Sequence, residues 1–148
     1  MKYFFIVLLA AATLGCAPKV DYRAEIASKE WRLVEIKQGE NGVKIDRAKL
    51  ADEGFANAFI VVFENDRLAG AGTANRFFAS YAIETDAINI STVASTRAAP
   101  IKEPKALKER EFFSLLRNAA QWRLNAGKLE LSTKNAGGGA ATLVFEGV

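Results

Sequence analysis

The strongest constraint on the fold is a succession of short runs rich in β-branched and aromatic residues, most of which have the length of strands. The runs are separated by turn-forming residues such as Asn41-Gly42, Asn65-Asp66 and Ala126-Gly127. Tight turns between consecutive strands imply antiparallel pairing. The expected strands are residues 31–37, 42–46, 59–64, 67–72, 81–84, 87–93, 121–125, 128–132 and 141–146.

One segment, residues 104–120, has helical rather than strand periodicity. Phe112, Leu116 and Ala119 recur at spacings of three and four, which predicts an amphipathic helix. Pro104 suits the first turn of this helix. The charged residues of the segment, Glu109 and Glu111 among them, are expected mostly on the opposite, solvated side. The expected fold class is α+β, with a strongly curved, barrel-like antiparallel sheet of about seven or eight strands and one long helix packed on it.

Composition narrows the chemistry that this chain can perform. Its 148 residues suit one domain, and they include no histidine and one cysteine. Histidine-dependent triads, His/Cys zinc sites, CxxC centres and intrachain disulfides are therefore excluded. The formal net charge is +3, spread along the chain, so a nucleic-acid partner is not expected. We expect no cofactor and no bound metal.

The first residues of the chain are typical of a secretory signal. Residues 1–15 contain Lys2 and a short apolar run that is too short for a permanent membrane span, so we expect a helical signal peptide. The sequence Thr13-Leu14-Gly15-Cys16 resembles the lipobox of bacterial lipoproteins. That resemblance implies cleavage before Cys16, acylation of Cys16 and attachment to a membrane. An ordinary secreted protein is the alternative. By the same resemblance, Ala17 after the cysteine implies an outer-membrane lipoprotein facing the periplasm.

The remainder is expected to contain a tether and one domain. Residues 16–28 have a proline and mixed charges, which favour a lipidated cysteine followed by a short tether, and residues 29–148 form the domain.

The stretch from Gly70 to Tyr81 is the most unusual part of the domain. Its spacing approaches that of a glycine-rich phosphate loop, but Asn75 stands where the third glycine is required and no βαβ unit follows. Gly70 and Gly72 are better explained as a bulge or bend in a curved sheet, after which Phe77 and Tyr81 return to the core.

Three polar residues are the candidate binding site. Asn75, Arg76 and Arg97 could meet an anion or an acidic protein surface if the two arginines share a cleft. A structural hydrogen-bonding role is the alternative for Asn75. No catalytic residue is expected, because the acidic pairs Glu64/Asp66 and Glu109/Glu111 are explained by solvation and no serine-lysine signature occurs.

The order of motifs resembles the META domain of HslJ-like bacterial lipoproteins. The elements that carry the resemblance are Trp31-Arg32-Leu33, the GxGxxNRF motif that starts at Gly70, and Ser95-Thr96-Arg97, with Leu129-x-Leu131 and Leu143-x-Phe145 near the end. The resemblance covers about residues 29–146. Members of this family commonly have cysteines where this chain has Ala74 and, approximately, Ala99, which implies that these two positions lie near each other.

What the resemblance implies about function is a role in the envelope linked to heat response or antibiotic tolerance, without an established reaction. The leading hypothesis is a monomeric, non-enzymatic protein attached to the membrane through Cys16 that acts by binding, with another envelope protein as the candidate partner. A carrier of a small apolar ligand and an inhibitor or adaptor of an envelope enzyme are the alternatives.

Overall fold

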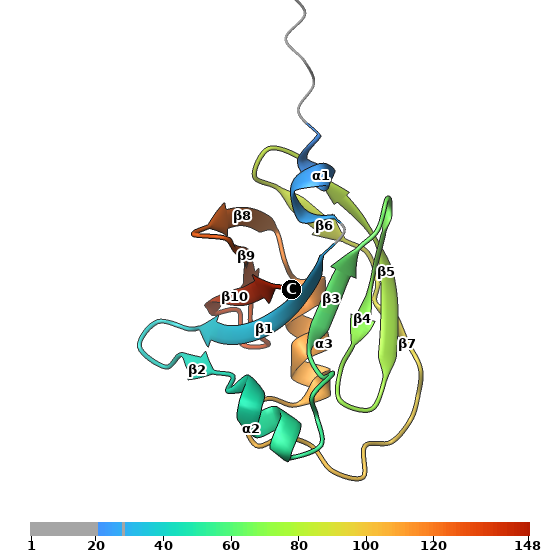
Figure 1. The fold of residues 1–148 in the computed structure, drawn as a ribbon. Helices are drawn as coiled ribbons and strands as arrows, with labels where there is room; N and C mark the ends of the chain where they lie inside the picture. Colours follow the sequence, from blue (N-terminus) through green and yellow to red (C-terminus); the bar gives the residue numbers. More distant parts are fainter. Residues whose placement is uncertain (1–20, 28) are drawn as a thin grey trace, which may run out of the picture.

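Ten strands in the described part of the chain form one antiparallel sheet that curls into a nearly closed barrel (Figure 1). The structure is a computed structural model that describes residues 21–27 and 29–148. Eight strands follow one another around the barrel in the order β6-β5-β4-β3-β1-β10-β9-β8, while β2 pairs with β1 and β7 pairs with β5. The strands are β1 (Glu30–Lys37), β2 (Val43–Lys44), β3 (Ile60–Phe63), β4 (Arg67–Ala71), β5 (Arg76–Ile83), β6 (Ile88–Ile90), β7 (Ala94–Ser95), β8 (Gln121–Asn125), β9 (Lys128–Lys134) and β10 (Ala140–Gly147).

The alternation of side chains along β5 explains why the chain forms a curved, one-sided sheet. Phe77, Ala79 and Tyr81 are buried, whereas Arg76, Phe78 and Ser80 are exposed. Successive strand residues point to opposite faces, so this pattern turns one face of the sheet toward the core. Phe77 and Tyr81 therefore contribute to the core, as the sequence predicted.

The barrel closes only weakly where its first and last strands meet. β6 and β8 approach through an isolated bridge between Ala87 and Gln121, and the Ile88 N–H donates to the Ala120 carbonyl at 3.1 Å. Other strand pairs have longer ladders, for example β9 with β10, which pair without interruption from Lys128–Glu146 to Lys134–Ala140. The expected barrel-like antiparallel sheet is thus confirmed, with eight strands around the barrel and two additional short ones.

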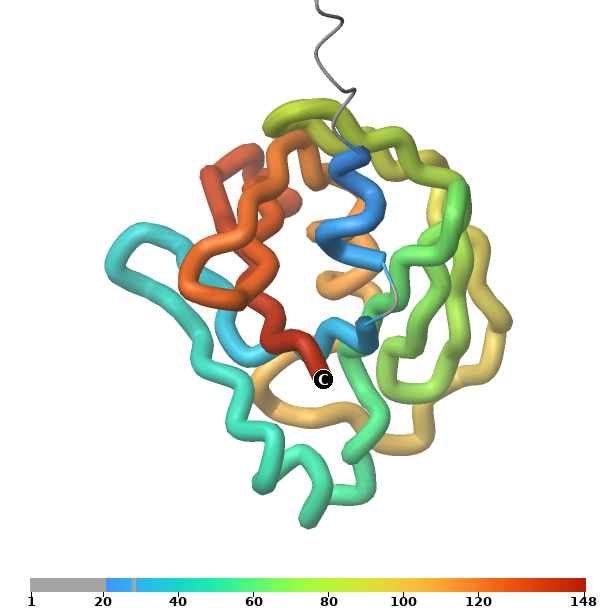
Figure 2. Tube along the Cα trace, turned by 45° about the horizontal axis from the view of Figure 1, so that its top comes forward, coloured from blue at the N-terminus to red at the C-terminus, as the bar shows by residue number. Residues whose placement is uncertain are grey.

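Three short helices accompany the sheet in the described residues. They are α1 (Tyr22–Ile26), α2 (Arg47–Asp52) and α3 (Glu109–Arg117). When the top of the molecule is turned forward, the strands trace a ring and α1 lies over its opening (Figure 2). Ile26 of α1 is fully buried, and its carbonyl accepts a hydrogen bond from the Trp31 indole. Residues 22–26, which the sequence predicted as part of a tether, therefore pack on the domain.

The prediction of one long helix over residues 104–120 was wrong in its length. The helix has nine residues and begins at Glu109, and Pro104 lies in the loop before it. Lys108 has extended backbone angles, and the Glu109 N–H donates to the Glu103 carboxylate, so the helix starts there. At the other end, the Ala120 N–H donates to Ser132 in β9, which draws the chain into the sheet.

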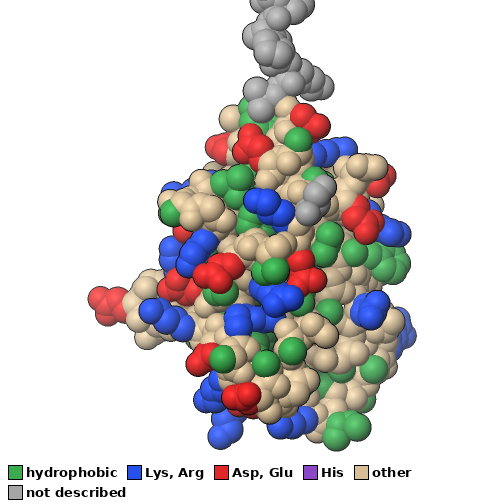
Figure 3. Space-filling view, in the orientation of Figure 1, with side chains coloured by type: hydrophobic (Ala, Val, Ile, Leu, Met, Phe, Trp, Pro, Cys, Tyr) green, Lys and Arg blue, Asp and Glu red, His purple; other side chains and the backbone are tan. Residues whose placement is uncertain are grey.

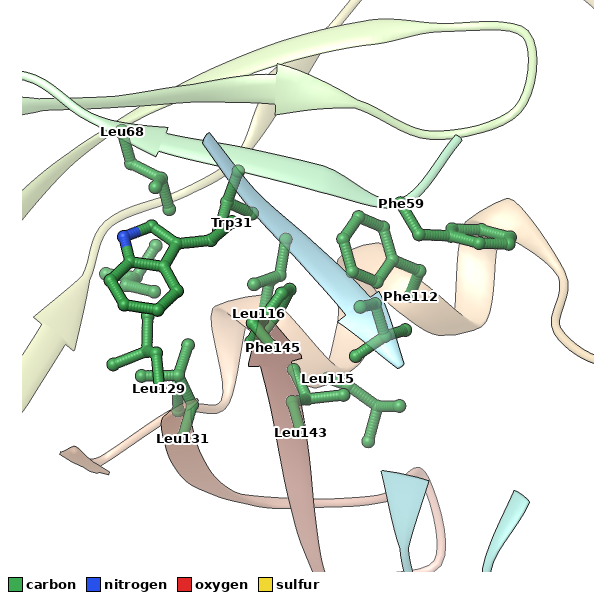
Figure 4. Close-up of a cluster of buried hydrophobic side chains, with 14 of the residues drawn as sticks. Trp31, Phe59, Leu68, Phe112, Leu115, Leu116, Leu129, Leu131, Leu143 and Phe145 are labelled. Atoms are coloured by element: carbon green, nitrogen blue, oxygen red, sulfur yellow. The ribbon is translucent and has the colours of Figure 1, made fainter. Parts of the chain in front are cut away.

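The core fills the space that the barrel encloses. Leu68, Leu129 and Leu131 lie near the Trp31 indole, while the rings of Phe59 and Phe112 face each other in an edge-to-face pair with centroids 5.2 Å apart (Figure 4). Phe112 comes from α3, Phe59 directly precedes β3, and the others come from strands; all are almost fully buried. The apolar stripe of α3 therefore packs against the inner face of the sheet, as expected.

The strand predictions were largely confirmed, although β2 and β6 are shorter than the expected strands 42–46 and 87–93, and two further differences concern β5 and β7. β5 begins at Arg76, five residues earlier than expected, because residues 76–80 alternate between exposed and buried positions. β7 was not predicted, since its two residues, Ala94 and Ser95, carry no strand-like pattern. The signal segment and Cys16 lie outside the described residues.

Candidate functional site

The loop between β4 and β5 wraps around the carboxylate of Glu109. The backbone N–H groups of Thr73, Ala74 and Asn75 donate to Oε2 of Glu109 at 2.7, 2.8 and 2.8 Å. The side-chain Nδ2 of Asn75 donates to Oε1 at 2.5 Å. Consecutive backbone N–H groups that converge in this way form an anion-binding nest. The glycine-containing loop thus does bind an anion, and the anion is the chain's own carboxylate.

Close approach requires glycine at Gly72 of this loop and at Gly70, which precedes it in β4. A Cβ on Gly72 would lie 2.4 Å from Oε2 of Glu109, and one on Gly70 would lie 2.0 Å from the Ile60 carbonyl oxygen. Real Cβ atoms do not come so close to other atoms. Gly72 therefore leaves room for the carboxylate and Gly70 leaves room for neighbouring β3, which gives these residues a structural role beside the bend.

Asn75 connects the loop to the segment after β7. Its Oδ1 accepts hydrogen bonds from the Thr96 hydroxyl at 2.8 Å and from the Ala98 N–H at 2.7 Å, and its Nδ2 also donates to the Ala98 carbonyl. The residue is 7% exposed and its amide is fully engaged. Asn75 therefore positions three segments, in agreement with its alternative structural interpretation.

Glu109 is a buried acid whose charge is stabilised by these donors. The residue is 6% exposed, and burial alone raises its pKa. The hydrogen bonds from the Asn75 side chain and from the backbone of Asn75, Ala74 and Thr73 outweigh burial and hold the pKa of Glu109 below its ordinary value. The expectation that Glu109 is solvated on an exposed helix face was wrong. We call Glu109, residues 72–75 and residues 96–98 the Glu109 cluster.

Arg76 and Arg97 lie on adjacent segments at the edge of this cluster. The Arg76 N–H donates to the Thr96 hydroxyl, and the Thr96 N–H donates to the Arg76 carbonyl. Both arginine side chains are exposed, and neither forms an ion pair within residues 21–27 and 29–148. They remain candidates for binding. Asn75 and Ala98 are hydrogen-bonded to each other, and they directly adjoin Ala74 and Ala99 in the chain. The latter two positions therefore lie near each other, as the family resemblance implied.

A groove of about 1130 Å³ runs beside α3. Val93, Ser95 and Pro100 line one side, α3 residues such as Phe113 and Arg117 line another, and the turn between β9 and β10 contributes residues 135–137. We call it the α3 groove. Arg76 and Arg97 are not among its lining residues, so the two predicted arginines do not share this cleft.

The α3 groove contains charged residues that the sequence analysis did not single out. Lys108, Arg110 and Arg117 line it, and all three are exposed. The sequence alone indicates only that they lie on the solvated side of a helix. No local pattern shows that a neighbouring strand and turn make this side one wall of a groove. That arrangement results from the path of residues 91–103 around the barrel together with the β9–β10 turn.

A second buried acid, Glu130, lies on the outer face of β9. It is 3% exposed and is paired with Lys37 Nζ at 3.1 Å and with Arg123 Nε at 2.5 Å. Burial raises its pKa, but the bonds from Lys37, Arg123 and Asn125 outweigh this effect, so the pKa of Glu130 also lies below its ordinary value. These partners come from different strands, so Glu130 links β1, β8 and β9.

The rest of the described surface offers little further chemistry. No group of three potential ligands among His, Cys, Asp and Glu comes together there to hold a metal ion. Basic and acidic side chains are scattered over the face seen in Figure 3 without a large area of one sign. Every helix in residues 21–27 and 29–148 is too short or too polar to span a bilayer.

One comparison with known proteins concerns the family, and another concerns the fold. The profile of the META domain matches residues 24–146. A protein from Burkholderia xenovorans, solved by NMR, has a TM-score of 0.58 and 19% identity, with 89% of this chain and 92% of that chain covered. A crystallised DUF4847 family protein from Bacteroides vulgatus has a TM-score of 0.53 and 16% identity, with 82% of this chain and 93% of that chain covered. At such identities the likeness concerns the fold alone. No curated protein matches the chain.

Proposed function

Because the chain belongs to the META domain family, we propose that it is a non-enzymatic, lipid-anchored envelope protein that acts by binding at its surface. The observation that carries this proposal is the contrast between the interior and the α3 groove. The interior is filled by side chains such as Trp31, Phe59 and Phe112, whereas the groove is open and its lining includes three exposed cations. A filled interior favours surface binding over the carriage of a small apolar ligand. The link to heat response or antibiotic tolerance rests on the family resemblance.

Attachment through Cys16 would hold the domain close to the bilayer. Four residues lie between Cys16 and Asp21, where the described chain begins, and the five Cα–Cα steps from Cys16 to Asp21 span at most about 18 Å. Helix α1 follows directly and lies over the opening of the barrel (Figure 2). The barrel end that bears α1 would therefore face the membrane. We propose the periplasmic face of the outer membrane as the location.

Substitution of the cysteine tests the anchor. In a bacterial host fed labelled palmitate, the full chain should carry the label and sediment with outer membranes, and Cys16→Ser should lose both properties. Thr13→Leu is the matched control, because it brings the segment closer to a lipobox and should keep both. Membrane association of Cys16→Ser equal to that of the unmodified chain would contradict the proposal.

A further inference from the structure

The outer edge of β7 is an unpaired strand edge that borders the α3 groove. Among the strands of residues 21–27 and 29–148, β7 pairs only with β5, and the Thr96 N–H turns toward β5 to reach the Arg76 carbonyl. Backbone groups of consecutive strand residues point to alternate sides, so the N–H and carbonyl of Ser95 point away from β5. Ser95 lines the α3 groove. The groove therefore has one wall that can pair with a further strand.

The opposite wall gives such a strand a surface on which to rest. Phe113 of α3 is half-buried in the wall, and its ring packs edge-to-face on Phe77 with centroids 5.1 Å apart. Val93 and Ala136 add apolar surface at either side. Side chains alternate along a strand, so an added strand could set one row of side chains on this apolar surface and direct the other toward the charged rim.

The charges of the rim fit an acidic occupant. Lys108, Arg110 and Arg117 are exposed and form no ion pair with any described residue. Of the acids that line the groove, Glu109 is held by the β4–β5 loop and Glu103 accepts the N–H that begins α3. Glu111 is the acid that remains, so cations without partners are in excess.

We propose that the α3 groove binds an extended acidic segment of a partner protein, which adds to β7 as a further strand and pairs its carboxylates with Arg110 and Arg117. This inference rests on the proposed binding function and names the class of partner that the α3 groove would bind. Such a partner is consistent with a role as an inhibitor or adaptor. The chain's own first twenty residues do not fit, because they contain Lys2 and Lys19 and no acidic residue. The complementary segment therefore belongs to another protein.

Designed peptides test this inference on the full chain in detergent micelles. The probes are a peptide of about eight residues with alternating valine and glutamate, and its valine-lysine counterpart. The acidic peptide should bind, with NMR amide shifts concentrated at Val93–Arg97 and along α3, and binding should weaken as salt rises. The basic peptide should not bind. Equal binding of the two peptides, or shifts confined to other surfaces, would overturn the inference.

Two variants separate the charges from the strand edge. Arg110→Gln with Arg117→Gln should weaken binding of the acidic peptide by about tenfold or more, because it removes the cations. Ser95→Pro should also weaken it, because proline lacks the N–H that an added strand would use. Lys44→Gln with Lys49→Gln is the control, since these exposed cations lie outside the groove. Unchanged binding in both groove variants would refute the inference.

The two proposals fail in different ways. Loss of the expected anchor would appear as unchanged membrane association of Cys16→Ser, which does not depend on the groove. The groove variants should be labelled with palmitate and should fractionate like the unmodified chain. If the chain is anchored but does not bind the acidic peptide, the proposed anchor stands and the proposed acidic partner is refuted.

Discussion

At the scale of single residues, the role of each polar group is set by distant neighbours. Asn75 belongs to a motif that resembles a ligand-binding loop, yet its amide is saturated by Ala98, Thr96 and Glu109. The sequence could predict that Asn75 caps a turn, because asparagine does so routinely. It could not identify Glu109 as the anion, since the two residues are 34 positions apart and no local pattern connects them.

Gly72→Ala should destabilise the domain strongly. The new Cβ would lie 2.4 Å from Oε2 of Glu109 and would displace the carboxylate from its backbone donors. Leaving these buried groups without partners should lower the free energy of unfolding by about 2–4 kcal/mol. Gly137→Ala is the matched control, because its Cβ would meet its nearest neighbour at an ordinary 3.5 Å. Denaturant unfolding measures both variants, and equal stabilities would contradict the assigned role of Gly72.

At the scale of elements, patterns within a segment were predictable and boundaries set by tertiary contacts were not. The alternation in β9 and the periodicity around Phe112 and Leu116 follow from burial of one face, and both are visible in the sequence. The start of α3 depends on the Glu103 carboxylate and on the β4–β5 loop. These partners lie outside residues 104–120, so the periodicity of that segment could not indicate where the helix begins. The predicted helix was therefore too long.

The same contacts make the attachment of α3 dependent on pH. The pKa of Glu109 lies below its ordinary value in the folded chain, against about 4.3 in an unfolded chain. Its contribution to stability is therefore complete above the unfolded pKa and is lost as pH falls through the folded pKa. Glu109→Gln should cost about 2 kcal/mol at neutral pH, and the difference from the unmodified chain should shrink under acid.

Denaturant titrations at several pH values measure this difference. The pKa of Glu130 is also below its ordinary value, so its contribution to stability is lost under acid as well. The stability of Glu109→Gln should therefore still fall in part as pH decreases. Glu111→Gln is the control on the same helix, because Glu111 is exposed and makes no ion pair with the described residues. A constant difference between Glu109→Gln and the unmodified chain across the acid range would contradict the mechanism.

At the scale of the whole molecule, the barrel combines a firmly paired half with a weak seam. β10 pairs along its length with β9 and with β1. The seam between β6 and β8 depends on the bridge at Ala87 and Gln121, which consists of two backbone hydrogen bonds, from the Ile88 N–H to the Ala120 carbonyl at 3.1 Å and from the Trp122 N–H to the Asp86 carbonyl at 2.9 Å. β7 pairs with β5, as β6 does, and the outer edge of β7 borders the α3 groove.

Hydrogen exchange should therefore divide the barrel into two regions. Amides of β10 and β9 should exchange only by global unfolding, whereas the Ile88 and Trp122 amides at the seam should exchange through a smaller opening with lower free energy. If the α3 groove takes an added strand, the valine-glutamate peptide should slow exchange at Val93–Arg97 and leave β10 unchanged, because it adds hydrogen bonds only on that side. Native-state exchange followed by NMR or mass spectrometry measures both effects. Uniform protection around the barrel would show instead that the seam closes as firmly as the other strand pairs.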